Sequence, residues 1–397
     1  MKKILAMVLA LTVVCTMLAG CGAPKNDGGA TSSSDAASSS VSTSKGFEIA
    51  LITDKGNIDD KSFNQGSWEG VVKFATDNKL TNKYYKPEEA TDAGYLAAID
   101  LAVTGGAKVI VTPGYLFEVP VYEAQTKYPD VKFILLDGEP HTADYKTFET
   151  KSNVASVKYA EQEPGYLAGY AAVADGMTKL GFMGGMAVPA VQAYGYGYLQ
   201  GAEAAAAKLG LADGAISVIY HYTGDFAETD TNKATAKTMY QEGTEVVFAC
   251  GGSVGKSVMS AAKEAGKKVI GVDVDQRADS DTVITSAMKE LGGSVIQVLD
   301  SIYKSNKWAD YAGKKTTFDA KNDGIGLPVS VNGDSNANSF DRFKSFKKAD
   351  YDAILATLKD GSVKPINTFK VADTTGVATA AELVSNLSLK KVKVQVR

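Results

Sequence analysis

Residues 47–78 read FEIALITDKGNIDDKSFNQGSWEGVVKFATDN, and they join an apolar run to an amphipathic segment through a polar loop. The apolar run at 47–53 predicts a buried β-strand. In 61–78 the apolar side chains, such as Phe63 and Phe74, recur at helical spacing and predict an α-helix. A strand that leads into a helix is the first part of a βαβ unit, from which parallel sheets are built.

The same alternation of apolar runs and helical segments recurs along the folded part of the chain. It falls into two consecutive series, which predict an α/β fold made of two doubly wound parallel-sheet lobes. The first series continues with strands at 108–112, 131–136 and 154–157 and helices at 95–104 and 117–128. The second has strands at 180–183, 216–222, 245–249 and 269–272 and helices at 192–209, 230–241 and 254–265.

The amino terminus has the features of a secretion signal. Lys2 and Lys3 precede an apolar run at 4–17, which is shorter than the roughly 20 residues of a membrane-spanning helix. The following Leu-Ala-Gly-Cys, which ends at Cys21, resembles the bacterial lipobox, whose cysteine is lipidated and becomes the first residue. We therefore predict a lipoprotein signal peptide at 1–20 and lipid on Cys21. An ordinary signal with an incidental cysteine is the alternative.

The composition narrows the function of the remaining chain. Residues 21–45 are mostly small and polar and predict a flexible tether after the lipidated cysteine. The net charge of −4, without a basic stripe, disfavours nucleic-acid binding. Cys250 is the only cysteine in the folded part, so no intrachain disulfide is possible. The two histidines, His141 and His221, have no metal-ligand spacing, and neither a metal nor a cofactor is expected.

Carboxylates follow directly after three of the predicted strands. They are Asp54, Asp137 and Asp273. Ligands of open α/β sheets bind at the carboxyl ends of the strands, and carboxylates accept hydrogen bonds from hydroxyls and amines. The bland alternative for the polar segment 59–62 is that it only caps the next helix. Taken together, the three strand ends favour a site for a polar ligand.

Two aromatic residues stand in loops that correspond between the series. Phe63 lies in the polar loop of the first series, and Phe226 follows Asp225 in the second. One ring from each lobe could enclose a planar ligand, and stacking contributes on the order of 1 to 3 kcal/mol per base. From composition alone, a phenylalanine near a helix start is more often a core residue.

A family resemblance adds to this interpretation. Residues 58–70, IDDKSFNQGSWEG, resemble the signature of the basic membrane protein family, purine-nucleoside-receptor-like lipoproteins that supply ABC importers. Further matches follow in family order at 133–137, 161–172, 181–185, 271–276 and 285–289. The similarity spans essentially all of 46–397, and the lipobox agrees with it.

The resemblance implies a type I periplasmic-binding-protein fold whose two lobes close on a nucleoside about a hinge. Lobe 1 is expected at 46–158 plus about 285–330, and lobe 2 at 159–284 plus about 331–397. The hinge would consist of the chain crossings near 158, 285 and 330. Ligand contacts from both lobes would favour the closed state.

The same resemblance implies a role for individual residues. Phe63 and Phe226 would lie on the two faces of the base, although the sequence around Phe226 departs from the family's usual run. The polar edge of the base would be bonded by Asp54, Asn64 and Asp137, and the ribose would be met by Gly251 or Gly252, Asp273 and Lys289. A buried carboxylate that bonds two vicinal hydroxyls rejects ligands that lack them. Tyr194, Tyr196 and Tyr198 are left as contacts or packing residues.

The predicted protein is thus a monomeric, lipid-anchored binding protein on the extracytoplasmic face of the cell membrane. Its partners would be a nucleoside, an ABC permease and the ATPase of that permease. A receptor that presents its ligand to a membrane sensor, or one for another small polar solute, is the alternative. Residues 251–257, GGSVGKS, suggest a phosphate-binding loop, but Cys250 replaces its first glycine. No nucleophile stands in a catalytic pattern, so an enzyme such as a nucleoside hydrolase is disfavoured.

Overall fold

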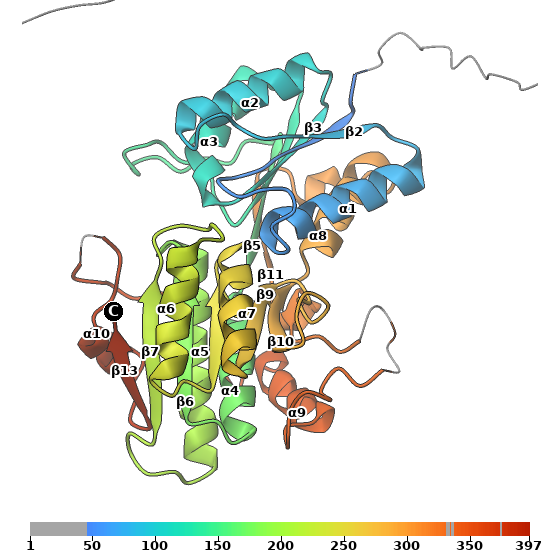
Figure 1. Ribbon diagram of the computed structural model, residues 1–397. Coiled ribbons are helices and arrows are strands. Elements are labelled where there is room, and N and C mark those ends of the chain that lie inside the picture. Colours follow the sequence, from blue (N-terminus) through green and yellow to red (C-terminus); the bar gives the residue numbers. More distant parts are fainter. Residues whose placement is uncertain (1–45, 331–333, 335–336, 374) are drawn as a thin grey trace, which may run out of the picture. The chain divides into compact units, whose positions relative to one another are not determined.

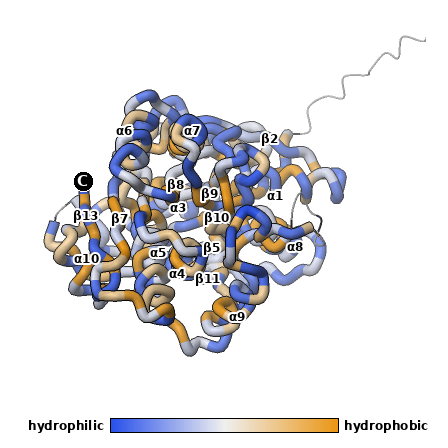
Figure 2. Tube along the Cα trace, turned by 60° about the horizontal axis from the view of Figure 1, so that its bottom comes forward, coloured by the Kyte–Doolittle hydropathy of each residue, from blue (hydrophilic) through white to orange (hydrophobic). Residues whose placement is uncertain are grey.

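The computed structural model describes residues 46–330, 334, 337–373 and 375–397, and the long strands among them gather into two sheets (Figure 1). The predicted signal peptide, Cys21 and the predicted tether lie outside the described residues. Figure 2 shows a hydrophobic stretch along strand β9 (Lys268–Asp273), as expected for a strand whose sheet is covered on both faces. Among the described residues, no helix has both the length and the apolar character needed to cross a membrane.

The first sheet has six strands in the order β11-β5-β4-β3-β1-β2, all of them parallel. Ile49 and Leu51 pack on the side of α1, whereas Ala50 and Ile52 pack on the side of α2 and α3. This alternation buries both faces of the sheet. We call this sheet and its helices lobe 1. Its elements are β1 (Ile49–Ile52), α1 (Phe63–Asn78), β2 (Asn82–Tyr85), α2 (Asp92–Thr104), β3 (Val109–Pro113), α3 (Glu118–Lys127), β4 (Lys132–Leu136), β5 (Val154–Tyr159), α8 (Leu291–Tyr303) and β11 (Lys314–Phe318).

The second sheet has seven strands in the order β12-β10-β9-β8-β6-β7-β13. All neighbours are parallel except β12, which runs antiparallel to β10. This sheet and its helices are lobe 2. Its elements are α4 (Gln162–Ala174), β6 (Lys179–Gly184), α5 (Pro189–Lys208), β7 (Ile216–Tyr222), α6 (Asp230–Gln241), β8 (Val246–Cys250), α7 (Val254–Ala265), β9 (Lys268–Asp273), β10 (Val283–Lys289), β12 (Ile325–Gly326), α9 (Lys348–Lys359), α10 (Ala380–Asn386) and β13 (Val392–Val396).

Helices cover both faces of the second sheet as well. Phe248 of β8 packs in the cluster that contains Tyr194 and Tyr198 of α5, and the neighbouring Val247 packs against α6 and α7. Helices α4 and α5 lie so close together that a Cβ at Gly169 would be only 2.0 Å from the carbonyl oxygen of Tyr198. This close contact fixes α5 against the end of the sheet where Tyr194 lies.

The chain crosses between the sheets three times. It leaves the first sheet after Tyr159, returns after Lys289, and leaves again between Phe318 and Ile325. The predicted boundary at about 285 falls inside β10, which belongs wholly to the second sheet. The boundary at about 330 falls beyond β12, which pairs with β10. The second sheet therefore continues to Lys289, beyond the expected crossing at about 285, and resumes at Ile325, before the expected crossing at about 330.

Candidate functional site

A cavity of about 720 Å³, its open mouth included, lies at the carboxyl ends of strands from both sheets. All nine side chains or backbones predicted to meet a ligand line it: Asp54, Phe63, Asn64, Asp137, Phe226, Gly251, Gly252, Asp273 and Lys289. Both the β1 loop of lobe 1 and the β9 end of lobe 2 contribute carboxylates to its wall.

A polar network orders the part of the wall that follows β1. The Asn64 side chain donates hydrogen bonds to Asp54 Oδ1 over 2.8 Å and to Asp60 Oδ2 over 2.9 Å. Its Oδ1 accepts from the Asp54 backbone nitrogen over 3.1 Å. Both amide protons of Asn64 are therefore used within the protein, and only its oxygen has capacity left for a ligand. Asp60 accepts from the backbone nitrogens of Asn64 and Gln65 and so caps α1.

Asp54 keeps one carboxylate oxygen for the cavity. Its Oδ1 accepts from the backbone nitrogen of Gly56 and from Asn64, whereas Oδ2 has no hydrogen-bond donor among the described residues. Burial raises the pKa of Asp54 to about 6, although the hydrogen bonds from Asn64 and Gly56 act to lower it. Near neutral pH the site thus holds a carboxylate that gains from a ligand donor.

Asp137 and Asp273 occupy equivalent places in the two sheets. Asp137 directly follows β4 and Asp273 ends β9, and both have a left-handed backbone, with φ of 57° and 66°. Residues other than glycine seldom adopt this conformation outside functional or tightly turned sites. The turn of the backbone brings both carboxylates to the cavity wall, where they are 9% and 7% exposed.

Asp273 is bonded by residues of both lobes. Ser62 Oγ donates to Asp273 Oδ2 over 2.5 Å, and the Tyr194 hydroxyl lies 3.5 Å from Oδ1. Burial raises the pKa of Asp273 to about 6, although the Lys289 ammonium and the Ser62 hydrogen bond act to lower it. Oδ1 is therefore the more weakly bonded oxygen and the better acceptor for a ligand.

Lys289 is the cationic centre of the site. Its Nζ donates to Asp137 Oδ2 over 2.5 Å and lies 3.2 Å from Glu161 Oε1. The ion-pair partners of Lys289 are therefore Asp137 and Glu161. Burial acts to lower the pKa of Lys289. The carboxylates of Asp137, Glu161 and Asp273 outweigh this effect and raise the pKa above its ordinary value.

The two predicted stacking rings reach the cavity from different lobes. Phe63 begins α1, and the Lys289 ammonium lies over its ring, 4.9 Å from the centroid. The cation takes one face of the phenyl ring, so a ligand could stack only on the other. Phe226, from the loop between β7 and α6, packs its ring on Gly185, where a Cβ would come within 2.4 Å of it.

Backbone conformation shapes the wall after β8. Gly252 has φ of 54°, and a Cβ at Gly251 would come 2.7 Å from the backbone nitrogen of Gly185. Only glycines allow the chain to turn this closely between β8 and α7. The turn belongs to the sequence GGSVGKS, and Lys256 within it donates to the carbonyl oxygen of Asp59 in lobe 1 over 3.0 Å.

Sequence reasoning missed several residues of the site. Tyr194 lines the cavity, whereas Tyr198 is fully buried elsewhere and Tyr196 packs on Phe369. Glu161 lies in the family match at 161–172, but the resemblance implies no role for it. Ser62 was considered only as a cap. Apolar and aromatic lining residues also went unnamed, among them Tyr115, Leu116, Val188 and Val191. None of these has a spacing signal, because tertiary packing brings each of them either to the cavity or to the residues that line it.

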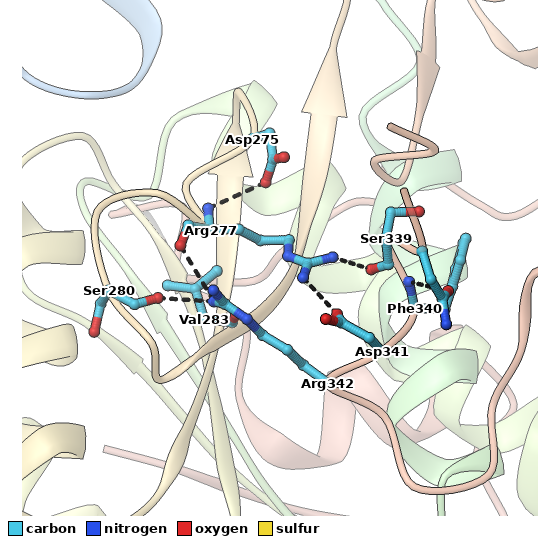
Figure 3. A network of polar contacts seen from close by, with 9 residues as sticks. Asp275, Arg277, Ser280, Val283, Ser339, Phe340, Asp341 and Arg342 are labelled. Carbon is cyan, nitrogen blue, oxygen red and sulfur yellow. Dashed lines mark hydrogen bonds and ion pairs between the residues drawn. The ribbon is translucent and has the colours of Figure 1, made fainter. Parts of the chain in front are cut away.

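Two arginines fasten the loop after β9 to the segment before α9 (Figure 3). Arg277 bonds Asp341 over 2.5 Å and donates to the carbonyl oxygen of Ser339. Arg342 donates to the carbonyl oxygens of three residues of the loop and strand, Arg277, Ser280 and Val283. This network holds the loop that begins at Asp273, and so it supports the position of that carboxylate.

Other candidate chemistries find little support. Among the residues that the structure describes, no cluster of three or more His, Cys, Asp or Glu could hold a metal ion. His141 contacts Glu118, and His221 contacts the Arg397 carbonyl oxygen. Cys250 lines the cavity, but burial raises the pKa of its thiol well above the ordinary value, which opposes a nucleophilic thiolate.

Comparisons with known proteins agree on one family. Residues 47–361 match the family described as ABC transporter substrate-binding protein PnrA-like. A protein of Lactococcus lactis subsp. cremoris (strain MG1363), named ABC transporter nucleoside-binding protein BmpA, is 30% identical over 82% of this chain and 91% of its own length. Basic membrane protein D of Borreliella burgdorferi (strain JD1) is 30% identical over 77% of this chain and 84% of its own length.

Solved structures share the fold. A solute-binding protein of an ABC transporter system from Aeropyrum pernix K1 superposes with a TM-score of 0.71 at 22% identity, over 86% of this chain and 97% of its own. A solute-binding protein of an ABC transporter system from Conexibacter woesei DSM 14684 has a TM-score of 0.61 at 22% identity. The match covers 82% of this chain and 100% of that protein. The predicted periplasmic-binding-protein architecture is thereby confirmed.

Proposed function

Because the chain belongs to the PnrA-like family of ABC transporter substrate-binding proteins, we propose that it captures a nucleoside, with a purine base preferred, between its two lobes. It then delivers the nucleoside to the permease and ATPase of an ABC importer. In this proposal Cys21 carries the lipid that anchors a monomer outside the membrane.

The observation that carries the nucleoside proposal is the set of side chains that line one cavity. Phe63 and Phe226 offer aromatic faces to a planar base, and carboxylates stand at the ends of strands from both sheets. Asp273 Oδ1 is suited to accept from ribose hydroxyls, and Asp54 Oδ2 from a donor on the base. The relative from Lactococcus lactis, which is called nucleoside-binding, supports the same ligand class.

Closure of the lobes is part of the proposal. The three crossings after Tyr159, after Lys289 and between Phe318 and Ile325 would serve as the hinge. A ligand that contacts Asp54 of lobe 1 and Asp273 of lobe 2 at once binds the closed state better than the open one. That difference in affinity is what shifts the population.

Mass spectrometry of the solute released on denaturing freshly purified protein tests the ligand class. A nucleoside should be recovered, and calorimetric titration with inosine, guanosine, adenosine and free hypoxanthine should rank them. Recovery of a non-nucleoside solute, together with no heat from any nucleoside, would reject the proposal. Free hypoxanthine formed from inosine during incubation would instead indicate a hydrolase.

The anchoring and transport parts need separate tests. Metabolic labelling with a fatty acid should mark the wild-type chain and not Cys21→Ser, which should leave the membrane fraction. Uptake of labelled nucleoside should fall when the gene is deleted, and Cys21→Ser should restore it only in part. Unchanged uptake, with a lost transcriptional response to nucleoside, would favour presentation to a membrane sensor.

A further inference from the structure

Glu161 is a buried carboxylate that does not line the cavity. It stands between β5 and α4, where the chain first crosses from lobe 1 to lobe 2, and its residue is 7% exposed. A buried carboxylate needs a partner, and its nearest cation is the Lys289 ammonium, 3.2 Å from Oε1. Lys289 ends β10, directly before the second crossing. The pair therefore links two of the three crossings.

The same ammonium reaches into the ligand site. Lys289 Nζ donates to Asp137 Oδ2 over 2.5 Å. The other oxygen, Asp137 Oδ1, is buried and has no hydrogen-bond partner among the described residues. A buried acceptor without a donor is unfavourable, so Oδ1 gains from a donor that enters the cavity.

The position of Lys289 decides whether Asp137 Oδ1 stays free. An ammonium has three donors, and here two anions lie around it, Glu161 and Asp137. If Glu161 lost its charge, only the Asp273 carboxylate, which is not an ion-pair partner, would oppose the attraction of the ammonium to Asp137. The ammonium could then move between both oxygens of Asp137 and satisfy Oδ1 itself.

We propose that Glu161 is a positioning residue for ligand binding: by sharing the Lys289 ammonium, it keeps Asp137 Oδ1 free to accept a hydrogen bond from the ligand. This role rests on the proposed nucleoside function, since it concerns the same cavity. Glu161 would touch neither base nor ribose, and its effect would pass through Lys289 and Asp137.

The charge of Glu161 is sensitive to pH. Burial raises the pKa of Glu161 to about 7, although the Lys289 ammonium acts to lower it. Asp137 acts to raise this pKa and Lys158 to lower it, and the Tyr194 hydroxyl and the Cys250 thiol also lie within the field of Glu161. As the pH falls through about 7, Glu161 takes up a proton and its hold on Lys289 weakens. Ligand affinity should decrease in this range, before Asp54 and Asp273 are protonated.

Calorimetric titration of inosine into wild type, Glu161→Gln and Glu163→Gln tests the proposal at pH 6.5 and 8.0. Glu163 is a matched control, because it also lies at the first crossing but accepts from the Ala320 backbone nitrogen. At pH 8.0 we expect about ten-fold weaker binding for Glu161→Gln, the loss typical of one charged hydrogen bond, and less than two-fold change for Glu163→Gln. Wild type should weaken between pH 8.0 and 6.5, and Glu161→Gln should not. Equal affinities and equal pH profiles for all three would overturn the proposal.

Two further measurements separate the possible failures. If wild type does not bind inosine, the nucleoside proposal fails, and the titrations are repeated with the solute recovered from wild type. Crystal structures of ligand-free wild type and Glu161→Gln report the position of Lys289 without any ligand. We expect Nζ to contact both oxygens of Asp137 only in the variant, and an unmoved Nζ contradicts the mechanism. If Glu161→Gln does not fold, Glu161→Asp retains the charge and should keep the pH dependence at reduced affinity; its loss would also count against the proposal.

Discussion

Ser62, which precedes the first helix of lobe 1, donates a 2.5 Å hydrogen bond to Asp273, which ends a strand of lobe 2. Two more contacts between the lobes lie beside it. Gln276 donates to the Lys61 carbonyl oxygen, and Lys256 donates to that of Asp59. The short segment 59–62 is thus held by lobe 2 at three points in this structure, next to the cavity. A ligand that bonds Asp273 would act on the same junction.

Replacing Ser62 with alanine should weaken nucleoside binding and shift its pH dependence. The variant loses a hydrogen bond to a charged group, which is worth about 1.5 to 3 kcal/mol. Because that bond lowers the pKa of Asp273, its loss should move the acidic limb of the affinity profile to higher pH. Calorimetry from pH 5 to 8 measures both effects. Ser67→Ala, which removes a hydroxyl bonded to the Phe63 carbonyl oxygen, is the control. An acidic limb that moves to lower pH would refute the argument.

Removal of the Asp273 carboxylate should affect nucleosides more than free bases. Asp273→Ala takes away the acceptor proposed for the ribose hydroxyls and leaves the wall around Asp54 in place. We expect a loss of about 1 to 3 kcal/mol for inosine and little change for hypoxanthine. Parallel titrations of both ligands measure the difference. Equal losses would show that Asp273 acts on the whole site instead of on the ribose.

Loss of the Phe63 ring should weaken every base to a similar extent. Stacking on an aromatic side chain is tolerant of base identity and contributes about 1 to 3 kcal/mol. Phe63→Ala should therefore lower the affinity for inosine, guanosine and adenosine alike, and Phe63→Tyr should retain most of it. Phe63→Leu, which keeps apolar bulk without a ring, separates stacking from simple burial. Full affinity in Phe63→Leu would show that stacking on the ring does not contribute to binding.

The contribution of Asp54 and Asp273 to the stability of the ligand-free protein should decrease as the pH rises from about 4 to 6. Burial raises the pKa of Asp54 and of Asp273 to about 6, so the folded state binds more protons than the unfolded state in this range. The stabilisation is fully present below the unfolded pKa near 4 and is lost as the pH passes the folded pKa.

Urea unfolding of wild type and Asp54→Asn between about pH 4 and 6 measures whether the unfolding free energy changes with pH in the expected direction. The variant removes one of the two groups, so the difference in unfolding free energy between variant and wild type should grow in favour of the variant as the pH rises. Asp77→Asn, at an exposed carboxylate of α1, serves as the control. A constant difference would mean that Asp54 does not titrate in this way.

Local patterns in the sequence determined most of the fold. The helices at 230–241 and 254–265 and the strand at 216–222 were predicted at the bounds that the structure has, and other predicted elements differ by a few residues. Apolar periodicity reports burial directly, and in parallel sheets that burial is nearly continuous along a strand. The strands that escaped prediction include β2, β11 and β13, which are partly exposed and mix polar with apolar residues. Each of these strands lies at the edge of its sheet, and β11 and β13 pair with strands that are distant in the sequence. The apolar pattern of each strand is therefore weak.

The sequence alone also determined which residues stand at the strand ends, and the family resemblance named nine of the residues that line the cavity. The tertiary structure decided how those residues are paired. Lys289 and Asp137 are 152 positions apart, and Ser62 and Asp273 are 211 apart. No local spacing encodes such contacts, because they arise only when two separately formed sheets bring their carboxyl edges together. For the same reason Glu161 had no role in the sequence and acquires one only beside Lys289 in the folded chain.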